Sequence, residues 1–257
     1  MMVPRRRGRS LVDQVVESIG QDIVSRRFAP GAQLPNETEW CERLDVSRSV
    51  LREALRVLVS KNLIDIRSRA GGRVRDDADW NLLDPDVLLW RSRSDDGGAF
   101  VAELFELRRV IEPAAAGLAA ARIGPQQLRD LTAALEEMEA AGEDTARFLE
   151  PDGRFHRLIL GSVGNSLFRA LGQAVTVALD ITLRLSLDAP KGQQQSLPLH
   201  RAVLEAISAQ DCEAAAAAML ALVNASERDV AEAGTDTPKS RRRRAGPGRP
   251  VAARNRR

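Results

Sequence analysis

The sequence of 257 residues is poor in aromatic side chains and contains no tyrosine. Aromatic residues make up only 4% of the chain, whereas hydrophobic residues of all kinds make up 44%. This composition supplies enough apolar material for a core and favours helices packed on helices over a large sheet. The length is sufficient for one large domain or two smaller ones.

Cysteines and long apolar segments are also scarce. The two cysteines, Cys41 and Cys212, lie far apart and form no C-x-x-C pair. This argues against a disulfide framework and against a zinc site built on cysteine. No apolar run approaches the roughly 18 residues of a membrane span, and no hydrophobic segment of a secretory signal follows the basic start "RRRGR". We therefore expect a cytoplasmic protein without a membrane partner.

Charge is distributed unevenly, although the net charge of the whole chain is only +2. Residues 1–75 carry a net charge of +6, residues 76–238 carry −13 and residues 239–257 carry +9. Two basic ends around an acidic middle indicate nucleic-acid contacts at the ends and a different role in the middle.

Turn residues and changes of hydrophobic period divide the chain into five parts. We predict a disordered basic arm over 1–10 and a disordered Arg-rich tail over 234–257. Between them we predict a DNA-binding domain over 11–75, a linker over 76–97 and an all-helical domain over 98–233. The expected fold class is mostly α, with an N-terminal winged helix-turn-helix and a C-terminal ligand-binding bundle of six to seven helices.

The first of these domains has the element order of a winged helix-turn-helix. Apolar residues every four positions predict a helix over 11–28, and a short helix over 37–44 follows it. Ser47 is suited to cap a third helix over 48–61. In "LIDIRSRAGGRVR" the period changes to two, which predicts a β-hairpin with its glycine pair in the turn.

The third helix carries the side chains expected to read DNA. Such a helix enters the major groove by its N-terminal end. An arginine there can bind guanine O6 and N7 bidentately, which discriminates by about 1–3 kcal/mol, and serines suit phosphate. The predicted DNA-binding residues are Ser47, Arg48, Ser49, Arg52, Arg69, Gly71 and Gly72. The alternative is a solvated helix face on which Arg52 and Arg56 are salt-bridged to acidic neighbours such as Glu53.

A resemblance to the GntR family of bacterial transcription regulators is visible in "PGAQLPNETEWCERLDVSRSVLREALRVLVSKNLIDIRSRAGGRV". The stretches "ELRRVIEPAAAGLAA" and "DGRFH" resemble the ligand-sensing FCD domain of its FadR subfamily, so the resemblance covers about residues 11–233. The linker "WNLLDPDVLLW" is similar to regulators of sugar-acid catabolism. The resemblance implies base or phosphate contacts from Arg48 and Arg52. Where the family often has a further arginine, this chain has Thr38.

The only two histidines of the chain point to a metal site in the helical part. Asp152 and His156 lie four residues apart and share a helix face, from which both can reach a divalent cation. The resemblance implies four ligands, of which Asp152, His156 and His200 occupy three places and Leu222 stands in the fourth. Zinc, nickel and manganese are the candidate ions, and open positions remain for an effector's oxygens. The alternative is a pair of ordinary histidines with satisfied hydrogen bonds.

The helical domain is also expected to bind a small carboxylate. A guanidinium binds a carboxylate bidentately, so arginine is suited to read a sugar acid. Arg108 matches the place where the family offers a basic side chain, and Arg228 lies two turns beyond Met219 on the last helix. The predicted effector-binding residues are Arg108, Thr182, Asn224 and Arg228. The alternative for each arginine is a surface salt bridge, with Glu112 or with Glu232.

Together these patterns predict a homodimeric transcription regulator that binds a palindromic operator in double-stranded DNA. We expect a repressor that is released by a galactonate-like sugar acid or another small carboxylate. Alternative effectors are lactate, another hexonate or hexuronate, and a fatty acyl-CoA. Other classes are a metal-dependent enzyme with an accessory winged helix and a constitutive architectural DNA-binding protein. The chain has neither a G-x-S-x-G motif nor a Gly-rich phosphate loop, so we expect no enzyme.

The Arg-rich tail allows two interpretations. Its "PGRP" is similar to the short core with which AT-hook peptides enter the minor groove. We favour a solvated tail that raises non-specific DNA affinity by counterion release.

Overall fold

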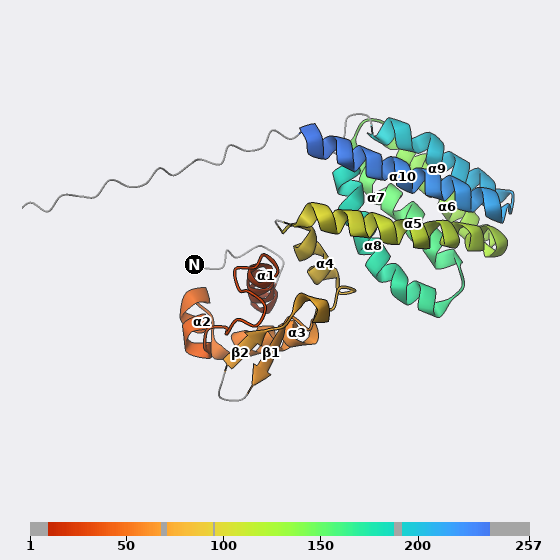
Figure 1. The fold of residues 1–257 in the computed structure, drawn as a ribbon. Coiled ribbons are helices and arrows are strands. Elements are labelled where there is room, and N and C mark those ends of the chain that lie inside the picture. The colour runs from red at the N-terminus through yellow and green to blue at the C-terminus, as the bar shows by residue number, and fades with distance from the viewer. Residues whose placement is uncertain (1–9, 68–70, 95, 188–191, 237–257) are drawn as a thin grey trace, which may run out of the picture.

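The computed structural model describes residues 10–67, 71–94, 96–187 and 192–236. A small N-terminal body of helices with one hairpin is joined to a larger bundle of helices (Figure 1). This is the predicted mostly α fold class. In the described part of the chain, no helix combines the length and hydrophobicity that crossing a bilayer requires.

The N-terminal body has the predicted order of helices and strands. It comprises α1 (Leu11–Val24), α2 (Glu37–Leu44), α3 (Arg48–Ser60), β1 (Ile64–Arg67), β2 (Gly71–Val74) and the short 3-10 helix η1 (Asp77–Asp79). Side-chain caps determine where the helices begin, because oxygens of Ser10, Asn36 and Ser47 each accept a backbone N–H from the first turn. Ser47 therefore caps the third helix as predicted.

The first helix is shorter than predicted. It ends at Val24 rather than near Phe28, because Arg26 adopts the left-handed conformation, with φ at 61°. The four-residue spacing of apolar residues in the sequence does not indicate this turn.

The glycine pair predicted in the hairpin turn lies in a strand instead. Gly71 and Gly72 belong to β2 and pair with the last two residues of the antiparallel strand β1. A Cβ added at Gly72 would lie only 3.1 Å from Leu34 Cδ1. The absence of a side chain therefore allows this strand to pack closely against the loop before α2.

Helix α4 (Pro85–Ser92) belongs to both bodies, although the sequence analysis assigned residues 76–97 to a linker. Val87 and Trp90 lie in the hydrophobic core of the N-terminal body, whereas Leu88 lies in the core of the bundle. The helix contacts α1 on one side and α8 on the other, and Figure 1 shows it between the two bodies.

A buried lysine ties the end of α3 to α4. Lys61 donates to both carboxylate oxygens of Asp84, at 2.7 and 2.8 Å, and to Asp86 at 2.8 Å, and it is only 8% exposed. Its ammonium lies 5.8 Å from the centroid of the Trp90 ring. Trp90 also covers Gly20 of α1, where a Cβ would come within 2.3 Å of the ring. The end of α3, α1 and α4 thus form one packed unit.

In the described residues the C-terminal bundle contains six helices, within the predicted six to seven. They are α5 (Gly97–Arg122), α6 (Pro125–Ala141), α7 (Thr145–Ser162), α8 (Ser166–Leu187), α9 (Gly192–Ser208) and α10 (Cys212–Asp236). Helices α5 and α10 lie side by side (Figure 1). Their backbones approach closely, since a Cβ at Gly117 would lie 3.0 Å from the carbonyl oxygen of Cys212.

Candidate functional site

The N-terminal end of α3 faces solvent, as contact with DNA requires. Its core-facing side is held by the buried residues Leu51, Ala54 and Leu58. The predicted DNA-contacting residues at this end are all exposed: Ser47, Arg48, Ser49 and Arg52. Ser47 Oγ accepts the Val50 N–H at 3.4 Å and lies 2.9 Å from Ser49 Oγ.

Arg52 pairs with a residue of the preceding helix, which its sequence neighbours did not indicate. Its Nε and Nη2 donate to the two carboxylate oxygens of Glu37, the first residue of α2, at 2.9 and 3.1 Å. The hydrogen bond from Arg52, with the charges of Arg52 and Arg48, holds the pKa of Glu37 below its usual range. Arg56, by contrast, pairs with Glu53 at 3.1 Å, as the solvated-face alternative expects.

Two arginines at the hairpin are hydrogen-bonded to other groups of the protein, although Arg73 is exposed and Arg75 is half-buried. Arg73 Nε donates to a backbone carbonyl at 2.7 Å, and Arg75 donates to Asp65 and Asp79 at 3.2 Å each. The predicted DNA contact Arg69 lies outside the described residues. The predicted glycine pair lies in β2, directly after that segment.

Six buried polar side chains meet inside the bundle. Each is at most 2% exposed, and they come from the four helices α5, α7, α8 and α9. They are Arg108, Glu112, Asp152, His156, Thr182 and His200. Because burying charged groups without partners is costly, the pairing of these groups indicates what the cluster can bind.

The three predicted metal ligands lie together in this cluster. One ligand atom from each of Asp152, His156 and His200 lies within 4.8 Å of the others. Asp152 Oδ1 is 3.0 Å from His200 Nε2 and 3.5 Å from His156 Nε2. The Nε2 atoms of both imidazoles therefore converge on one carboxylate oxygen.

Each histidine has a neighbour at its other ring nitrogen. His156 Nδ1 lies 2.8 Å from Glu112 Oε2, close enough for an ion pair but not aligned as a hydrogen bond. His200 Nδ1 lies 2.9 Å from the carbonyl oxygen of Ser196. A histidine that binds a metal commonly gives its second N–H to a carboxylate or a backbone carbonyl. In that tautomer both Nε2 lone pairs face the Asp152 carboxylate, and either a metal cation between them or protonation of the imidazoles relieves the repulsion. The donor set therefore suits a divalent ion.

The pKa values of the cluster show how it balances charge by itself. Burial would lower the pKa of His156, but the negative charges of Glu112 and Asp152 raise it to about 9. Burial would raise the pKa of Glu112, but Arg108 and His156 lower it to about 2. The pKa of Asp152 is also lowered, because His200 and His156 outweigh the effect of burial. A protonated His156 and ionised carboxylates are the stable forms near neutral pH.

Arg108, the predicted effector contact, is completely buried. Its Nε donates to Glu112 Oε1 at 2.6 Å and its Nη1 to Thr182 Oγ1 at 2.6 Å. Its Nη2 is buried and has no hydrogen-bond partner among the described residues. The alternative partner Glu112 is therefore present, but the pair is buried rather than on the surface. One nitrogen of the guanidinium still has N–H donors to offer.

The remaining predicted side chains lie on α10 with different orientations. Asn224 is half-buried and Arg228 is exposed. Residues nine apart in an α-helix are about half a turn out of phase. The spacing from the buried Met219 therefore does not bring Arg228 to the cluster in this structure. Leu222, in the place of the fourth ligand, packs in the hydrophobic core.

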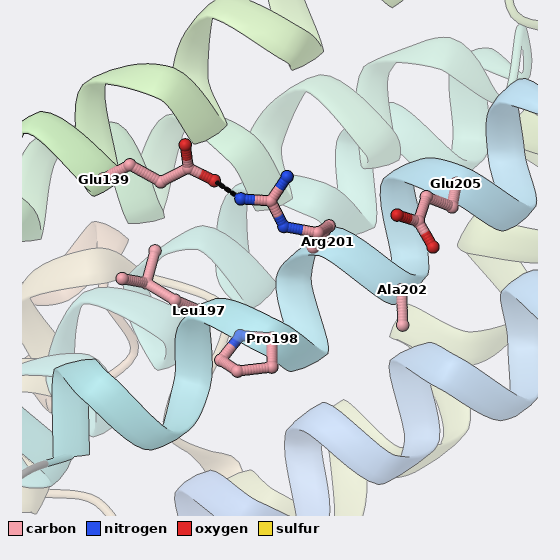
Figure 2. Close-up of a pocket in the computed structure, with 6 residues that line it drawn as sticks. All are labelled: Glu139, Leu197, Pro198, Arg201, Ala202 and Glu205. Carbon is pink, nitrogen blue, oxygen red and sulfur yellow. Dashed lines mark hydrogen bonds and ion pairs between the residues drawn. The ribbon is translucent and has the colours of Figure 1, made fainter.

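A separate groove lies on the surface between α6 and α9 (Figure 2). It is lined by Glu139, Leu197, Pro198, Arg201, Ala202 and Glu205. Arg201 pairs with Glu139 across it, whereas the neighbouring His200 is buried in the polar cluster. The groove contributes no ligand atom to that cluster.

The N-terminal end of the α3 helix of the winged helix-turn-helix is exposed. The bundle joined to it buries side chains that are suited to bind a cation and a carboxylate. These two features define a ligand-responsive DNA-binding regulator. The chain belongs to the gntR family of bacterial regulatory proteins, whose pattern matches residues 11–74, and residues 103–225 match the FCD domain.

Several relatives are similar over most of the chain. The galactonate operon transcriptional repressor of Escherichia coli is 34% identical over 221 residues, which are 86% of this chain and 96% of that protein. The HTH-type transcriptional regulator Rv0494 of Mycobacterium tuberculosis is 34% identical over 216 residues, which are 83% and 87% of the two chains. These relatives are transcription regulators, and the protein is a transcription regulator rather than an enzyme.

A solved structure supports the fold. The regulator Lar of Listeria monocytogenes is 17% identical and covers 90% of this chain and 100% of its own, with a TM-score of 0.61.

Proposed function

We propose that the protein is a homodimeric repressor of a sugar-acid catabolic operon and that a small carboxylate such as galactonate releases it from a palindromic operator. The observation that carries this proposal is the buried Arg108, whose Nη2 has no hydrogen-bond partner among the described residues and which lies in the same cluster as the three candidate metal ligands. The 34% identity to the E. coli galactonate operon repressor supports the sugar acid as the effector class.

Asp152, His156 and His200 would hold a divalent ion, with zinc, nickel or manganese as candidates. Glu112 and the Ser196 carbonyl would orient the two imidazoles. When bound, the ion supplies open positions for effector oxygens. The hydrophobic Leu222 leaves one more of these positions without a protein ligand.

A sugar acid suits both parts of the cluster. Its carboxylate can accept from Arg108 Nη2, and its hydroxyl and carboxylate oxygens are ligands that divalent ions accept. Lactate and hexuronates share this chemistry and are the nearest competitors. A fatty acyl chain would offer no acceptor to the buried Nη2 of Arg108, so it fits less well.

The DNA-binding half requires a second copy of the chain. One α3 helix covers only a half-site, and a two-fold symmetric dimer reads a palindrome. Effector binding would then shift the population between orientations of the two bodies, provided that the effector binds one orientation more tightly. Helix α4, which lies in both cores, is the element through which that shift would pass.

The effector proposal is tested with operators selected from a random duplex pool. We expect galactonate to raise the melting temperature and to weaken operator binding in gel shifts, and lactate and hexuronates to act less strongly. Arg108→Lys should still bind the operator but lose the response, whereas Arg201→Ala, in the surface groove, should respond normally. A protein whose melting and operator binding ignore all these acids would contradict the proposal.

The metal is tested separately by calorimetric titration of the chelator-treated protein with Zn²⁺, Ni²⁺ and Mn²⁺. His156→Ala and His200→Ala should abolish tight binding, and Leu222→His should tighten it by supplying a fourth ligand. Binding that survives both histidine substitutions would place the ion elsewhere.

A further inference from the structure

The pair of Glu37 and Arg52 links the two helices of the helix-turn-helix across their exposed surface. Glu37 begins α2 and Arg52 lies in the second turn of α3. Their side chains are 39% and 62% exposed, yet both carboxylate oxygens meet the guanidinium in a two-bond fork. Exposed ion pairs usually add little to stability unless they are bidentate, as this one is. The two bonds also fix the orientation of the Arg52 guanidinium.

Counting donors shows that the fork leaves the guanidinium able to bind a base. An arginine has five N–H donors, and Glu37 takes the Nε–H and one N–H of Nη2. Both N–H groups of Nη1 and the second one of Nη2 remain. One N–H from each of these two nitrogens forms the end edge of the guanidinium, and this edge can donate to guanine O6 and N7. Glu37 and a guanine can therefore be bound at the same time, on different edges.

We propose that Glu37 is a specificity-determining residue, which holds Arg52 in the orientation that reads a guanine without touching the base itself. The inference rests on the proposed role of Arg52 in reading DNA. An unrestrained arginine can swing to a phosphate, where it carries no sequence information. Fixing its side edge on Glu37 removes those orientations before DNA is bound and favours the base contact.

The charge of Glu37 distinguishes this role from a simple contribution to affinity. The carboxylate is ionised, and it sits at the positively polarised N-terminus of α2. Close to DNA it repels phosphate. Glu37 should therefore lower or leave unchanged the affinity for arbitrary DNA while it raises the preference for one base. A residue that merely supported the fold would not separate these two quantities.

Two nearby groups serve as internal controls. Glu53 on α3 is also exposed and pairs with Arg56, so Glu53→Ala removes the same charge from the same surface without touching Arg52. Arg48 is exposed and predicted to contact DNA, but among the described residues it has no ion pair of its own. Arg48 acts on Glu37 through its charge alone, so base preferences that depend on Arg48 should change less with Glu37 than those that depend on Arg52.

The test is selection from a random duplex pool with the full chain, using wild type, E37A, E37Q, R52A, E53A and the double variant E37A/R52A. We expect R52A to remove the preference for guanine at one position of each half-site. E37A should weaken the preference at that same position roughly ten-fold, and E37Q should do so less. The double variant should have a guanine preference no weaker than that of R52A, and E53A should keep the base preferences of the wild type. Melting curves confirm that the exposed substitutions leave the fold intact.

Three results would overturn the proposal. If E37A binds all sequences equally more tightly with an unchanged base profile, Glu37 only repels phosphate. If E37A sharpens the guanine preference, Glu37 masks Arg52 instead of orienting it. If R52A leaves every base preference intact, Arg52 reads no base, and both assignments fail while DNA binding by the family fold stands.

Discussion

Glu112 touches both halves of the buried cluster, because one of its oxygens accepts from Arg108 and the other lies beside His156. At the scale of single residues, this side chain joins the predicted effector contact to a predicted metal ligand. Sequence reasoning named Glu112 only as a surface partner of Arg108. Because Glu112 is buried, removing its partner Arg108 affects the stability of the fold.

Arg108→Ala should destabilise the fold rather than merely abolish the effector response. It removes the cation that pairs with a buried carboxylate, and such a loss costs about 3–5 kcal/mol. Urea unfolding measures the change, and Arg201→Ala, on the surface, should stay within about 0.5 kcal/mol of wild type. Adding Glu112→Gln to Arg108→Ala should recover part of the loss. A double variant less stable than Arg108→Ala would show that Arg108 is not the main partner of Glu112.

Stability without metal should depend on pH at both ends of the range. Glu112 has a pKa of about 2 against an ordinary 4.5, so its contribution is complete above pH 4.5 and is lost as the pH falls toward 2. His156 has a pKa of about 9 against 6.5, so its contribution is complete below pH 6.5 and is lost as the pH rises through 9. With a chelator present, the contribution of this pair to the free energy of unfolding should be greatest between pH 4.5 and pH 6.5.

Urea midpoints against pH measure this profile. Glu112→Gln should reduce the alkaline loss, because it removes the charge that most raises the pKa of His156. An alkaline limb of unchanged slope in Glu112→Gln would contradict this account.

At the scale of elements, the contact between α1 and α4 offers a sharp test of packing. Gly20→Ala would place a Cβ 2.3 Å from the Trp90 ring, so α4 would have to move. We expect a loss of about 1–3 kcal/mol, as overpacking of a core produces. Gly161→Ala in α7 has open space around its Cβ and should instead stabilise by about 0.4–1 kcal/mol. Thermal melts compare the stabilities of the two variants. Equal changes in melting temperature would contradict the close contact between Gly20 and Trp90.

The tie between Lys61 and α4 is a second test at this scale. Lys61→Met keeps the aliphatic stem but leaves the N-terminal carboxylates of α4 without their cation, and we expect a loss of about 1–3 kcal/mol. Amide hydrogen exchange should quicken in α4 while the helices of the bundle keep their protection. Unaltered exchange in α4 would show that Trp90 alone holds the helix.

The elements differ in how far the sequence predicts them. Helix α2 has the predicted bounds because its caps are local: Asn36 accepts from the first turn and Asp45 takes the left-handed position at its end. Helix α4 escaped prediction because its stretch buries side chains on opposite faces in two cores, which removes the apolar stripe. The spacing of Asp152 and His156 predicts that they share a face of α7, whereas the place of His200 beside them followed only from the family resemblance, since nothing local joins α7 to α9.

At the scale of the whole molecule, net charge separates the two functions. Segment 76–238 has a net charge of −13 and includes the helical bundle. The two basic ends carry the charge that attracts DNA. Removing residues 239–257, which carry +9, should weaken binding to arbitrary DNA and flatten its dependence on salt, because fewer counterions are released. Fluorescence anisotropy at several salt concentrations measures both. A deletion that also altered base preference would favour the minor-groove interpretation of "PGRP".

Helix α4 also sets where this protein can be cut and rejoined. A chimaera that exchanges the N-terminal body with that of a relative needs a junction after Ser92. Val87 and Trp90 then stay with the N-terminal body, in whose core they pack. Even with this junction, Leu88 of the transferred helix packs in the hydrophobic core of a bundle from another protein. Grafting a new sensor therefore means redesigning one face of a single eight-residue helix while leaving its other face alone.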